Sequence, residues 1–327
     1  MLEVAMVGCG DVSVVHLEAI DALDGARLVA AVDTDADGRR AAGERWQVPT
    51  YDRVERMLRE VAPDVVHIAT PHDQHVDPAI ACLEAGVSVL LEKPVAHTMA
   101  EAERLIATAD RHPDVKIGVC LQNRYNATSI ALRSLLDSAV LGAVLGGHGT
   151  VCWHRSPAYY EARPWRGRRS RSGGGVLINQ AIHTLDLLQW LVGPVTTVAG
   201  RADHYGPAAI DVEDTAQIAL THAGGASSVF FATNLNPIDA PVSLQIATEQ
   251  ATLELHGDLT IAYADGRVEV VRERQASSSG RSYWGVSHAL LIADFYARLG
   301  DPEPFWIGPR EAATVQWIID EVYRQSR

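Results

Sequence analysis

The first 120 residues alternate short apolar runs with longer stretches of helical periodicity, and this alternation constrains the fold more than any other feature. The apolar runs show no polar alternation, which is typical of strands buried on both faces of a sheet. Together with the helical stretches, they predict a doubly wound α/β domain around a parallel sheet. The predicted strands are Glu3–Val7, Arg27–Val32, Val65–Ala69, Ser88–Leu91 and Lys116–Val119, and the predicted helices lie near 12–22, 35–45, 52–60, 74–85 and 99–111.

After about residue 120 the pattern changes. From Thr196 to Val271, strand-like runs recur with Gly, Asp or Asn turns between them, which predicts an antiparallel sheet region. The other predicted elements are a helix over Ala127–Asp137, a strand over Val144–Arg155, a helix from about Gly175 to Val192, a linker at 275–282, and helices near 285–298 and 309–324. We therefore predict two domains, residues 1–121 and 122–327, with the C-terminal helix a candidate to pack back on the first domain.

Composition excludes several classes of protein. Of the 327 residues, 47% are hydrophobic and 21% charged, which is typical of a soluble globular chain with a substantial core. The net charge of −13 argues against general binding to nucleic acid or anionic membranes. No apolar run approaches the ~20 residues that span a bilayer, and the start of the chain lacks the basic region of a secretory signal. The four cysteines are far apart and form no C-x-x-C pair, so we expect neither disulfides nor a zinc site, and a reducing cytoplasm.

A glycine-rich turn, GCGDVS at 8–13, follows the first predicted strand and opens the first predicted helix. Gly8 permits the tight turn, and Gly10 lets the backbone approach a pyrophosphate at the helix N-terminus. Ser13 is small enough for close packing of helix on strand. Asp33 ends the second predicted strand, where a carboxylate can bond both ribose hydroxyls and would repel a 2′-phosphate. The pattern predicts dinucleotide binding, with NAD preferred over NADP; the alternative is a structural turn with a surface Asp.

Of the 28 lysines and arginines, only Lys93 and Lys116 are lysine. Lys93 lies between the apolar run Val87–Leu91 and Pro94. Arginine cannot lose its proton at any useful pH, whereas a desolvated lysine can, so Lys93 is a candidate for chemistry. The alternative is a strand that ends where a lysine meets water.

The longer apolar helix of the second domain carries a polar stripe. At ~100° per residue, Asn179, His183, Asp186 and Trp190 fall within about 60° of one another. Buried polar groups need partners, so the stripe predicts a site or a network. Asp186 could orient one ring nitrogen of His183 and leave the other for a substrate hydroxyl. Three preceding glycines, 173–175, permit close approach; the alternative is a structural histidine.

Two more polar segments follow predicted strands, at the edge where ligands bind in this architecture. The turn that contains Thr70, Pro71, His72 and His75 is predicted to contact a cofactor. A metal site is disfavoured there, because no Cys or Glu at ligand spacing joins the two histidines. Arg124, in the segment QNRY, is predicted to face the ligand-binding cleft at this same edge of the sheet.

A basic loop lies within this acidic chain, with five arginines between residues 163 and 171. These side chains, Arg166 among them, could receive a phosphate or carboxylate of a substrate. A solvated loop, or one paired with an acidic neighbouring subunit, is the equal alternative. Tyr160 and Trp165 could stack on the face of a sugar ring.

In combination these motifs resemble the glucose–fructose oxidoreductase/inositol dehydrogenase (Gfo/Idh/MocA) family over essentially the full length. The resemblance rests on the glycine-rich turn, the T-P-x-x-x-H turn, Glu92-Lys93-Pro94, the glycine run followed by Asn-x-x-x-His, and the C-terminal sequence from ADFYARLG onward. It implies an N-terminal Rossmann domain and a C-terminal α+β domain with an open, mostly antiparallel sheet. That sheet often serves as an oligomer interface, which implies a homodimer or homotetramer. The implied activity is reversible hydride transfer between NAD(P) and a secondary alcohol of a sugar, cyclitol or sugar derivative.

The resemblance also implies residue roles, with Lys93 as the active-site lysine and His183 as the acid/base; no metal site is expected in the chain. Asn179 stands where the family often has Asp and cannot accept a proton, which leaves His183 and Lys93 as the pair. Parts of the chain, such as NQ-x-IHTLDLLQW, are similar to a subgroup that includes UDP-sugar-acid 3-dehydrogenases. The predicted cofactor contacts are Gly8, Gly10, Asp11, Val12, Asp33, Thr70, Pro71, His75, Glu92 and Lys93, and the predicted substrate contacts are Arg124, Tyr160, Trp165, Arg166, Asn179 and His183.

Two other functions stay open on the sequence alone. Some relatives with this fold bind NAD or a sugar as sensors or corepressors without turnover, and others are glycosidases or epimerases that use NAD transiently. The presence of both Lys93 and His183 favours an enzyme, because a sensor does not need that pair.

Overall fold

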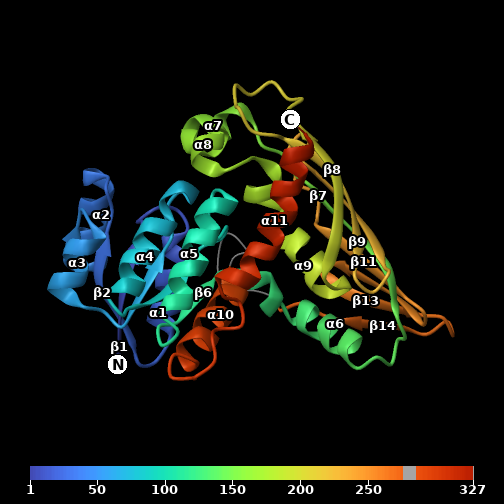
Figure 1. The fold of residues 1–327 in the computed structure, drawn as a ribbon, viewed down its shortest axis with the longest axis horizontal. Helices are drawn as coiled ribbons and strands as arrows, with labels where there is room; N and C mark the ends of the chain where they lie inside the picture. The colour runs from blue at the N-terminus through green and yellow to red at the C-terminus, as the bar shows by residue number, and fades with distance from the viewer. Residues whose placement is uncertain (275–284, 327) are drawn as a thin grey trace. The chain divides into compact units, whose positions relative to one another are not determined.

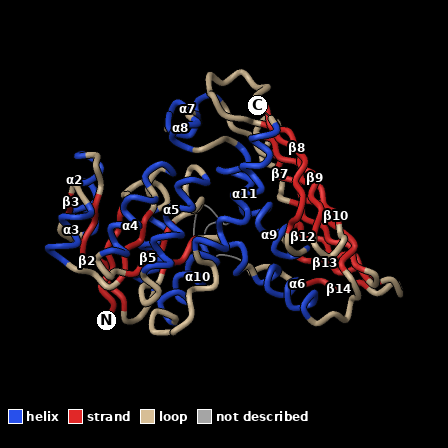
Figure 2. Tube along the Cα trace, viewed as in Figure 1, coloured by secondary structure: helices blue, strands red, loops and turns tan. Residues whose placement is uncertain are grey.

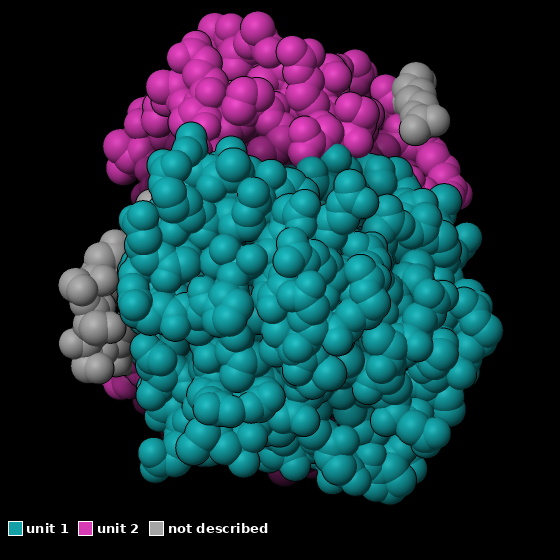
Figure 3. Space-filling view, turned by 90° about the vertical axis from the view of Figure 1, so that its left-hand side faces the viewer, with its two compact units in different colours: residues 1–122, 276–313 teal, residues 123–275, 314–327 magenta. Residues whose placement is uncertain are grey.

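The computed structural model describes residues 1–274 and 285–326. The chain forms two compact units, Met1–Gln122 with Ala276–Ala313 and Asn123–Gln275 with Thr314–Arg327 (Figure 3). The first unit thus takes in a segment that the predicted boundaries place in the second domain. Within it, helix α10 (Gly285–Ala297) packs on helix α1 (Ser13–Ala22). The predicted linker at 275–282 lies outside the described residues.

The first unit contains a parallel six-stranded sheet in the order β3-β2-β1-β4-β5-β6 (Figure 1). This order and the helices between the strands confirm the predicted doubly wound domain. The short β3 is absent from the predicted set, because two residues carry no periodic signal. The strands are β1 Leu2–Val7, β2 Ala26–Val32, β3 Thr50–Tyr51, β4 Val65–Ile68, β5 Ser88–Leu91 and β6 Ile117–Val119.

Helices connect these strands and cover the sheet. Because the strands run parallel, the turns that follow β1, β4 and β5 lie at the same edge of the sheet, and the predicted cofactor residues are grouped there. Strand β4 is buried along its whole length, although it carries the polar His67 among Val and Ile. The other helical elements of the unit are α2 Ala36–Trp46, α3 Val54–Val61, η1 His72–Gln74, α4 Val76–Glu84 and α5 Met99–Arg111.

The second unit contains an eight-stranded sheet in the order β14-β13-β12-β11-β7-β10-β9-β8. Strands β7 and β10 pair in parallel and the other neighbours pair antiparallel, which confirms a mostly antiparallel sheet. The strands are β7 Val144–Cys152, β8 Val195–Asp203, β9 Thr215–His222, β10 Ser227–Thr233, β11 Ser243–Thr248, β12 Ala251–His256, β13 Asp258–Tyr263 and β14 Val268–Val271.

One face of this sheet carries the core of the second unit. Helix α9 (Ile182–Val192) packs on β7, β10 and β11, and a π-helical turn, η4 (Val176–Ala181), leads into it. Figure 2 shows α6 and α9 on the same face. Alternate residues of β10 point to the other face, where Val229 and Phe231 are 56% and 40% exposed. The remaining helical elements are η2 Gln122–Tyr125, α6 Ala127–Asp137, α7 Pro157–Ala162, η3 Pro164–Gly167, α8 Arg169–Ser172 and α11 Pro309–Gln325.

Every helix in the described part of the chain is too short or too polar to cross a membrane.

Candidate functional site

The glycine-rich turn has the geometry that its sequence predicts. Gly8 has φ +90°, and a Cβ on it would lie 2.6 Å from the carbonyl oxygen of Ala69, so only glycine fits. Helix α1 begins at Ser13, whose hydroxyl donates to the carbonyl of Gly10 at 2.6 Å. The predicted contacts Asp11 and Val12 lie between them, on the first turn at the helix N-terminus.

Gly10 differs from Gly8, because a Cβ on it would meet no protein atom within 4 Å. Packing within the protein therefore does not require a glycine there, whereas close approach of a pyrophosphate does. The Asp33 carboxylate is fixed beside this turn by two backbone donors, the N–H of Cys9 at 2.8 Å and the N–H of Asp35 at 2.9 Å. A fixed carboxylate next to an open glycine at a helix N-terminus fits an NAD whose ribose bonds Asp33.

His75 connects two of the predicted cofactor segments. Its ring is fully buried, with Nδ1 2.7 Å from the carbonyl oxygen of Pro94 and Nε2 2.9 Å from that of Thr70. Burial lowers the pKa of His75, although both carbonyl groups favour its charged form. Both ring nitrogens are thus engaged within the protein, and His75 holds the turn after β4 against the turn after β5. These bonds give it a positioning role, and the direct cofactor contact stays a prediction.

The two lysines have different surroundings. Lys116 is buried, and its ammonium donates to the carbonyl of Glu303 at 2.8 Å, which is a structural role. Lys93 is only half-buried and follows Glu92, which is 6% exposed. The Glu92 carboxylate accepts the backbone N–H of Lys93 at 3.2 Å. The lysine that the sequence singled out is therefore the one whose side chain is partly accessible.

Glu92 is also bonded to two buried histidines. His16 Nε2, from α1, and His288 Nε2, from α10, each lie 3.0 Å from Glu92 Oε1. Burial alone would raise the pKa of Glu92, but the hydrogen bonds and charges of His16 and His288 hold it well below its usual range. The carboxylate predicted to line the cofactor thus also belongs to a network inside the first unit.

Sequence reasoning missed this network. Donor atoms of His16, Glu92, Cys120 and His288 all lie within 4.8 Å of one another, and all four residues are buried. Such a set can hold either a metal ion or shared protons, and the hydrogen bonds of Glu92 to both histidines suit shared protons. A sequence signal was present at His67 in the strand VVHIA, because a histidine in a fully buried apolar strand needs a polar partner. The partner of His67 is His16, a member of this network.

In the second unit, the predicted polar stripe is partly confirmed. Of residues 172–192, all of which the structure describes, only Asn179, His183 and Trp190 are not buried. Asp186 is 1% exposed and pairs with Arg124, whose Nε and Nη2 donate to its two oxygens at 2.8 and 2.6 Å. The main partner of the Asp186 carboxylate is therefore Arg124, and the orientation of His183 by Asp186 stays a prediction.

Arg124 is itself 1% exposed, and its guanidinium also lies over the Trp190 ring, 5.1 Å from the centroid. Its bidentate bond to Asp186 is an internal ion pair that ties the segment before α6 to helix α9. Substrate contact by Arg124 stays a prediction that this ion pair does not support.

Two glycines of the predicted run, Gly174 and Gly175, pack closely against other residues of the second unit. A Cβ on Gly174 would lie 1.9 Å from the Tyr323 hydroxyl, and one on Gly175 would lie 1.8 Å from the Glu213 carbonyl oxygen. The Glu213 carboxylate accepts the N–H groups of Gly175 and Leu177 at 2.8 and 3.1 Å and the hydroxyl of Tyr323 at 2.7 Å. The close approach that the glycines permit is therefore to Glu213 and Tyr323, which fix the start of the helix.

The residues of the basic loop are partly engaged within their own unit. Tyr160 is 7% exposed and accepts a hydrogen bond from Asn234 at 3.2 Å, so it packs in the core. Arg166 lies over the Tyr159 ring, 4.5 Å from its centroid, and 5.9 Å from that of Trp165. Trp165 and Arg166 are half-buried, so a stacking role fits Trp165 better than Tyr160.

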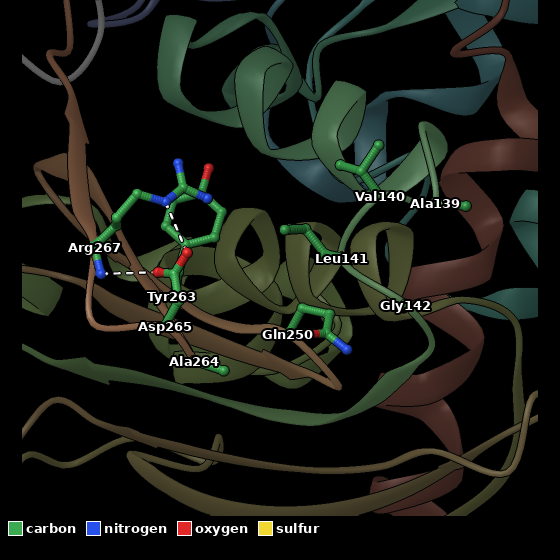
Figure 4. Close-up of a pocket in the computed structure, with 9 residues that line it drawn as sticks. All are labelled: Ala139, Val140, Leu141, Gly142, Gln250, Tyr263, Ala264, Asp265 and Arg267. Atoms are coloured by element: carbon green, nitrogen blue, oxygen red, sulfur yellow. Dashed lines mark hydrogen bonds and ion pairs between the residues drawn. The ribbon is translucent and has the colours of Figure 1, made fainter.

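A separate hollow of about 560 Å³ lies in the second unit between the turn at 139–142 and the β13–β14 hairpin (Figure 4). Arg267 lines one side of it, bonded to Asp265 at 2.9 Å and lying over the Tyr263 ring, 4.1 Å from the centroid. None of the predicted site residues lines it, and the charged side chains that line it, Asp265 and Arg267, are paired with each other.

Comparisons with known proteins match both parts of the chain. Residues 2–119 match a family described as "Oxidoreductase family, NAD-binding Rossmann fold", and residues 130–257 match the GFO/IDH/MocA C-terminal domain. The chain is 30% identical over 323 residues to a candidate UDP-kanosamine synthase oxidoreductase subunit of Amycolatopsis mediterranei, covering 90% of this chain and 87% of that protein. It is 31% identical over 226 residues to D-apiose dehydrogenase of Paraburkholderia graminis, with 69% of this chain and 58% of that protein covered.

Among solved structures, the WlbA dehydrogenase from Bordetella pertussis in complex with NADH and UDP-GlcNAcA has a similar fold. The TM-score is 0.86 and the sequence identity 29%, with 100% of this chain and 96% of that chain covered.

Proposed function

This chain belongs to the Gfo/Idh/MocA family of oxidoreductases with an NAD-binding Rossmann fold, and on that premise we propose that it transfers hydride between NAD and a secondary alcohol of a nucleotide-linked sugar, most specifically a UDP-linked sugar acid. The observation that carries the proposal is the accessible stripe on an otherwise buried helix. Asn179 and His183 are polar, partly exposed and one helical turn apart, which suits the recognition of a sugar hydroxyl.

The residues that would hold NAD are those of the sheet edge in the first unit. The N–H groups of the turn at 8–13 would bind the pyrophosphate, and Asp33 would bond the adenosine ribose. Thr70, Pro71, Glu92 and Lys93 would line the nicotinamide side. When bound, NAD supplies the hydride acceptor for alcohol oxidation.

His183 is proposed to take the hydroxyl proton, since a neutral imidazole is a suitable base near neutral pH. Lys93 is proposed to donate a hydrogen bond to the same oxygen and to stabilise the developing alkoxide charge. Asn179 cannot carry charge, so its proposed role is to bond and orient the substrate. A lysine suits the position of Lys93 because its compact ammonium can approach one oxygen and can lose its proton.

The proposed substrate class rests on two features. The dehydrogenase bound to UDP-GlcNAcA is 29% identical over the whole of this chain. The basic loop of this chain offers arginine side chains such as Arg163 and Arg168, which are exposed and suit the phosphates and carboxylate of such a ligand. Trp165 would stack on an apolar sugar face.

The experiment is a substrate panel with purified protein and NAD, followed by the absorbance of reduced nicotinamide. We expect turnover with UDP-linked sugar acids, with unlinked sugars and inositol as comparison substrates. Lys93→Arg keeps a cation, and His183→Gln keeps a hydrogen-bonding side chain; each should lower kcat by roughly 10²–10⁴-fold. His256→Gln, at an exposed position in β12, is the control and should retain wild-type turnover. If Lys93→Arg keeps activity within a few-fold, its proposed role is wrong.

The same family premise supports a homodimer or homotetramer formed through the open face of the second unit's sheet. Val229 and Phe231 are large exposed apolar residues on neighbouring positions of that face, which suits burial against a second copy. Analytical ultracentrifugation should show an oligomer for the wild type and dissociation for Phe231→Glu. A monomeric wild type, or an unchanged oligomer in the variant, would contradict this arrangement.

A further inference from the structure

A chain of hydrogen bonds crosses the interior of the first unit. The hydroxyl of Tyr296 lies 2.9 Å from His67 Nε2, and His67 Nδ1 lies 2.9 Å from His16 Nδ1. His16 Nε2 in turn lies 3.0 Å from Glu92 Oε1. His16 and His67 are fully buried, whereas Tyr296 is a partly exposed residue, so the chain links a tyrosine nearer the surface to a buried carboxylate.

The hydrogen bonds define one arrangement of protons in which every ring is neutral. Glu92 as a carboxylate can only accept, so His16 carries its proton on Nε2. The bare Nδ1 of His16 then accepts from His67 Nδ1–H, and the bare Nε2 of His67 accepts from the Tyr296 hydroxyl. In this unloaded state the group carries one negative charge, on Glu92.

The same positions allow a second, fully bonded arrangement with one more proton. Tyr296 takes a proton from water and passes its own to His67 Nε2, and His67 passes its Nδ1 proton to His16 Nδ1. His16 becomes an imidazolium that donates to Glu92 and to His67, and the Tyr296 hydroxyl accepts from His67. No heavy atom moves, and the added proton belongs to the coupled pair of His16 and Glu92.

Other titratable groups of the described residues lie near this pair. His288 of α10 donates to Glu92, and Cys120, after β6, is a buried thiol whose pKa burial raises well above its usual range. Lys93 and His75 are further charged or titratable neighbours of Glu92. Burial and the nearby His16 lower the pKa of His67 well below its usual value, so a proton does not rest on that ring.

We propose that His16 and Glu92 form a proton-loading site, filled from solvent through Tyr296 and His67, whose charge follows the redox state of the bound nicotinamide. Glu92 follows β5 at the sheet edge that carries the predicted cofactor residues, and His16 belongs to the helix that begins at the glycine-rich turn. Oxidised nicotinamide carries a positive charge and reduced nicotinamide does not. The unloaded, negative pair therefore stabilises bound NAD⁺, and the loaded, neutral pair forms when that positive charge is lost.

This inference rests on the proposed binding of NAD near Glu92 but not on any sugar substrate. Because proton binding and cofactor binding are linked, raising the pH unloads the pair and strengthens the binding of NAD⁺ relative to NADH. The ratio of the Kd for NAD⁺ to the Kd for NADH should fall as the pH is raised from about 6 to 8, and tenfold per pH unit is the limit for one proton.

The test measures both Kd values by calorimetry across this pH range, in buffers of different ionisation enthalpy so that protons taken up or released are counted. The wild type should exchange different numbers of protons with NAD⁺ and with NADH. Glu92→Gln should abolish the pH dependence of the ratio, and Lys93→Arg should retain it, because arginine does not titrate. Tyr296→Phe should leave the ratio at equilibrium unchanged but slow proton uptake in a stopped-flow indicator assay, and Tyr263→Phe serves as the matched control.

Equal proton exchange for the two cofactors in the wild type would overturn the proposal, and this measurement does not depend on whether a variant folds. Retention of the pH dependence in Glu92→Gln, or its loss in Lys93→Arg, would also overturn it. Metal analysis of the purified protein provides a further test. A stoichiometric metal ion bound by His16 and Glu92 would take the place of the shared protons and would also overturn the proposal. Failure of the sugar panel with intact proton linkage would instead count against the proposed substrate alone.

Discussion

Among the described residues, each unit contains one buried glutamate close in sequence or structure to a segment with a proposed catalytic side chain, and the two carboxylates are held in different ways. Glu92 precedes Lys93 and is bonded to the rings of His16 and His288, which can gain and lose protons. Glu213 supports the start of the helix that carries His183 and is bonded to two backbone N–H groups and a tyrosine hydroxyl. Backbone donors cannot titrate, so the donors around Glu213 mainly fix geometry, whereas the histidines around Glu92 can change their charge.

The pKa directions agree with this difference. The histidines outweigh burial at Glu92 and hold its pKa well below the usual range. At Glu213, burial outweighs the hydrogen bonds of Tyr323, Leu177 and Gly175, and its pKa is raised. Two buried carboxylates thus respond oppositely to pH because of the donors around them. The contrast suggests that changes in the first unit act on cofactor binding and that changes in the second act on stability.

The largest expected effect is in the second unit, at the buried ion pair. Arg124→Met leaves the Asp186 carboxylate buried without its guanidinium, which should lower the free energy of unfolding by about 3–5 kcal/mol. The double variant Arg124→Met with Asp186→Leu removes both charges and should recover much of the loss. Urea unfolding monitored by tryptophan fluorescence measures the stability of both variants. If Arg124→Met unfolds with a free energy within about 1 kcal/mol of wild type, the structural role assigned to this ion pair is wrong.

The next effect separates two glycines of the first unit. Gly8→Ala places a Cβ 2.6 Å from the Ala69 carbonyl oxygen at φ +90°, and should destabilise the protein without cofactor by about 1–3 kcal/mol. Gly10→Ala meets no protein atom within 4 Å, so it should change stability by less than about 0.5 kcal/mol while weakening NAD⁺ binding. Thermal unfolding and calorimetric Kd values check the pair. Equal effects of the two substitutions on both quantities would contradict the placement of the pyrophosphate at Gly10.

A smaller effect is expected on cofactor choice. Asp33→Asn keeps an oxygen that can accept the Cys9 N–H but removes the charge that would repel a 2′-phosphate. The preference for NAD⁺ over NADP⁺, taken as a ratio of Kd values, should fall by roughly 10–100-fold, or about 1.4–2.8 kcal/mol. The stability of the protein without cofactor should change little. An unchanged ratio would show that Asp33 does not contact the ribose.

The smallest effect tests the comparison of the two carboxylates itself. The lowered pKa of Glu92 means that its contribution to stability is present above the unfolded pKa of about 4.3 and is lost as the pH falls through its folded pKa. The raised pKa of Glu213 means that its contribution is present below about pH 4.3 and is lost as the pH rises through its folded pKa.

Urea unfolding of the wild type, Glu92→Gln and Glu213→Gln across this range measures the two slopes. The stability difference between wild type and Glu92→Gln should shrink as the pH falls, and that for Glu213→Gln should shrink as the pH rises. Each slope is limited to about 1.4 kcal/mol per pH unit for one proton. If the two stability differences changed with pH in the same direction, the proposed distinction between Glu92 and Glu213 would be wrong.

The sequence was sufficient for the fold because the periodic signals are local. Apolar runs such as Val65–Ala69 have the length and composition of buried strands, and the glycine-rich turn has a single structural context that suits it. The stripe of Asn179 and His183 was also visible, because helical spacing alone decides which residues share a side.

The pairing of polar groups could not be predicted in the same way. Asp186 shares the stripe's spacing, yet its partner Arg124 lies 62 residues earlier in the chain. The members of the Glu92 network come from α1, β4, the turn after β5 and α10, and only the folded unit brings them together. Periodicity indicates that a buried polar group needs a partner, but it does not identify that partner.

The most direct test of the proposed function is a crystal structure of the protein with NAD and a UDP-linked sugar acid that it oxidises slowly. The account predicts that Lys93 Nζ and a ring nitrogen of His183 both lie within about 3.2 Å of one sugar oxygen. Its carbon should face the nicotinamide. A substrate oxygen bonded to neither side chain, or a sugar bound away from the nicotinamide, would contradict it.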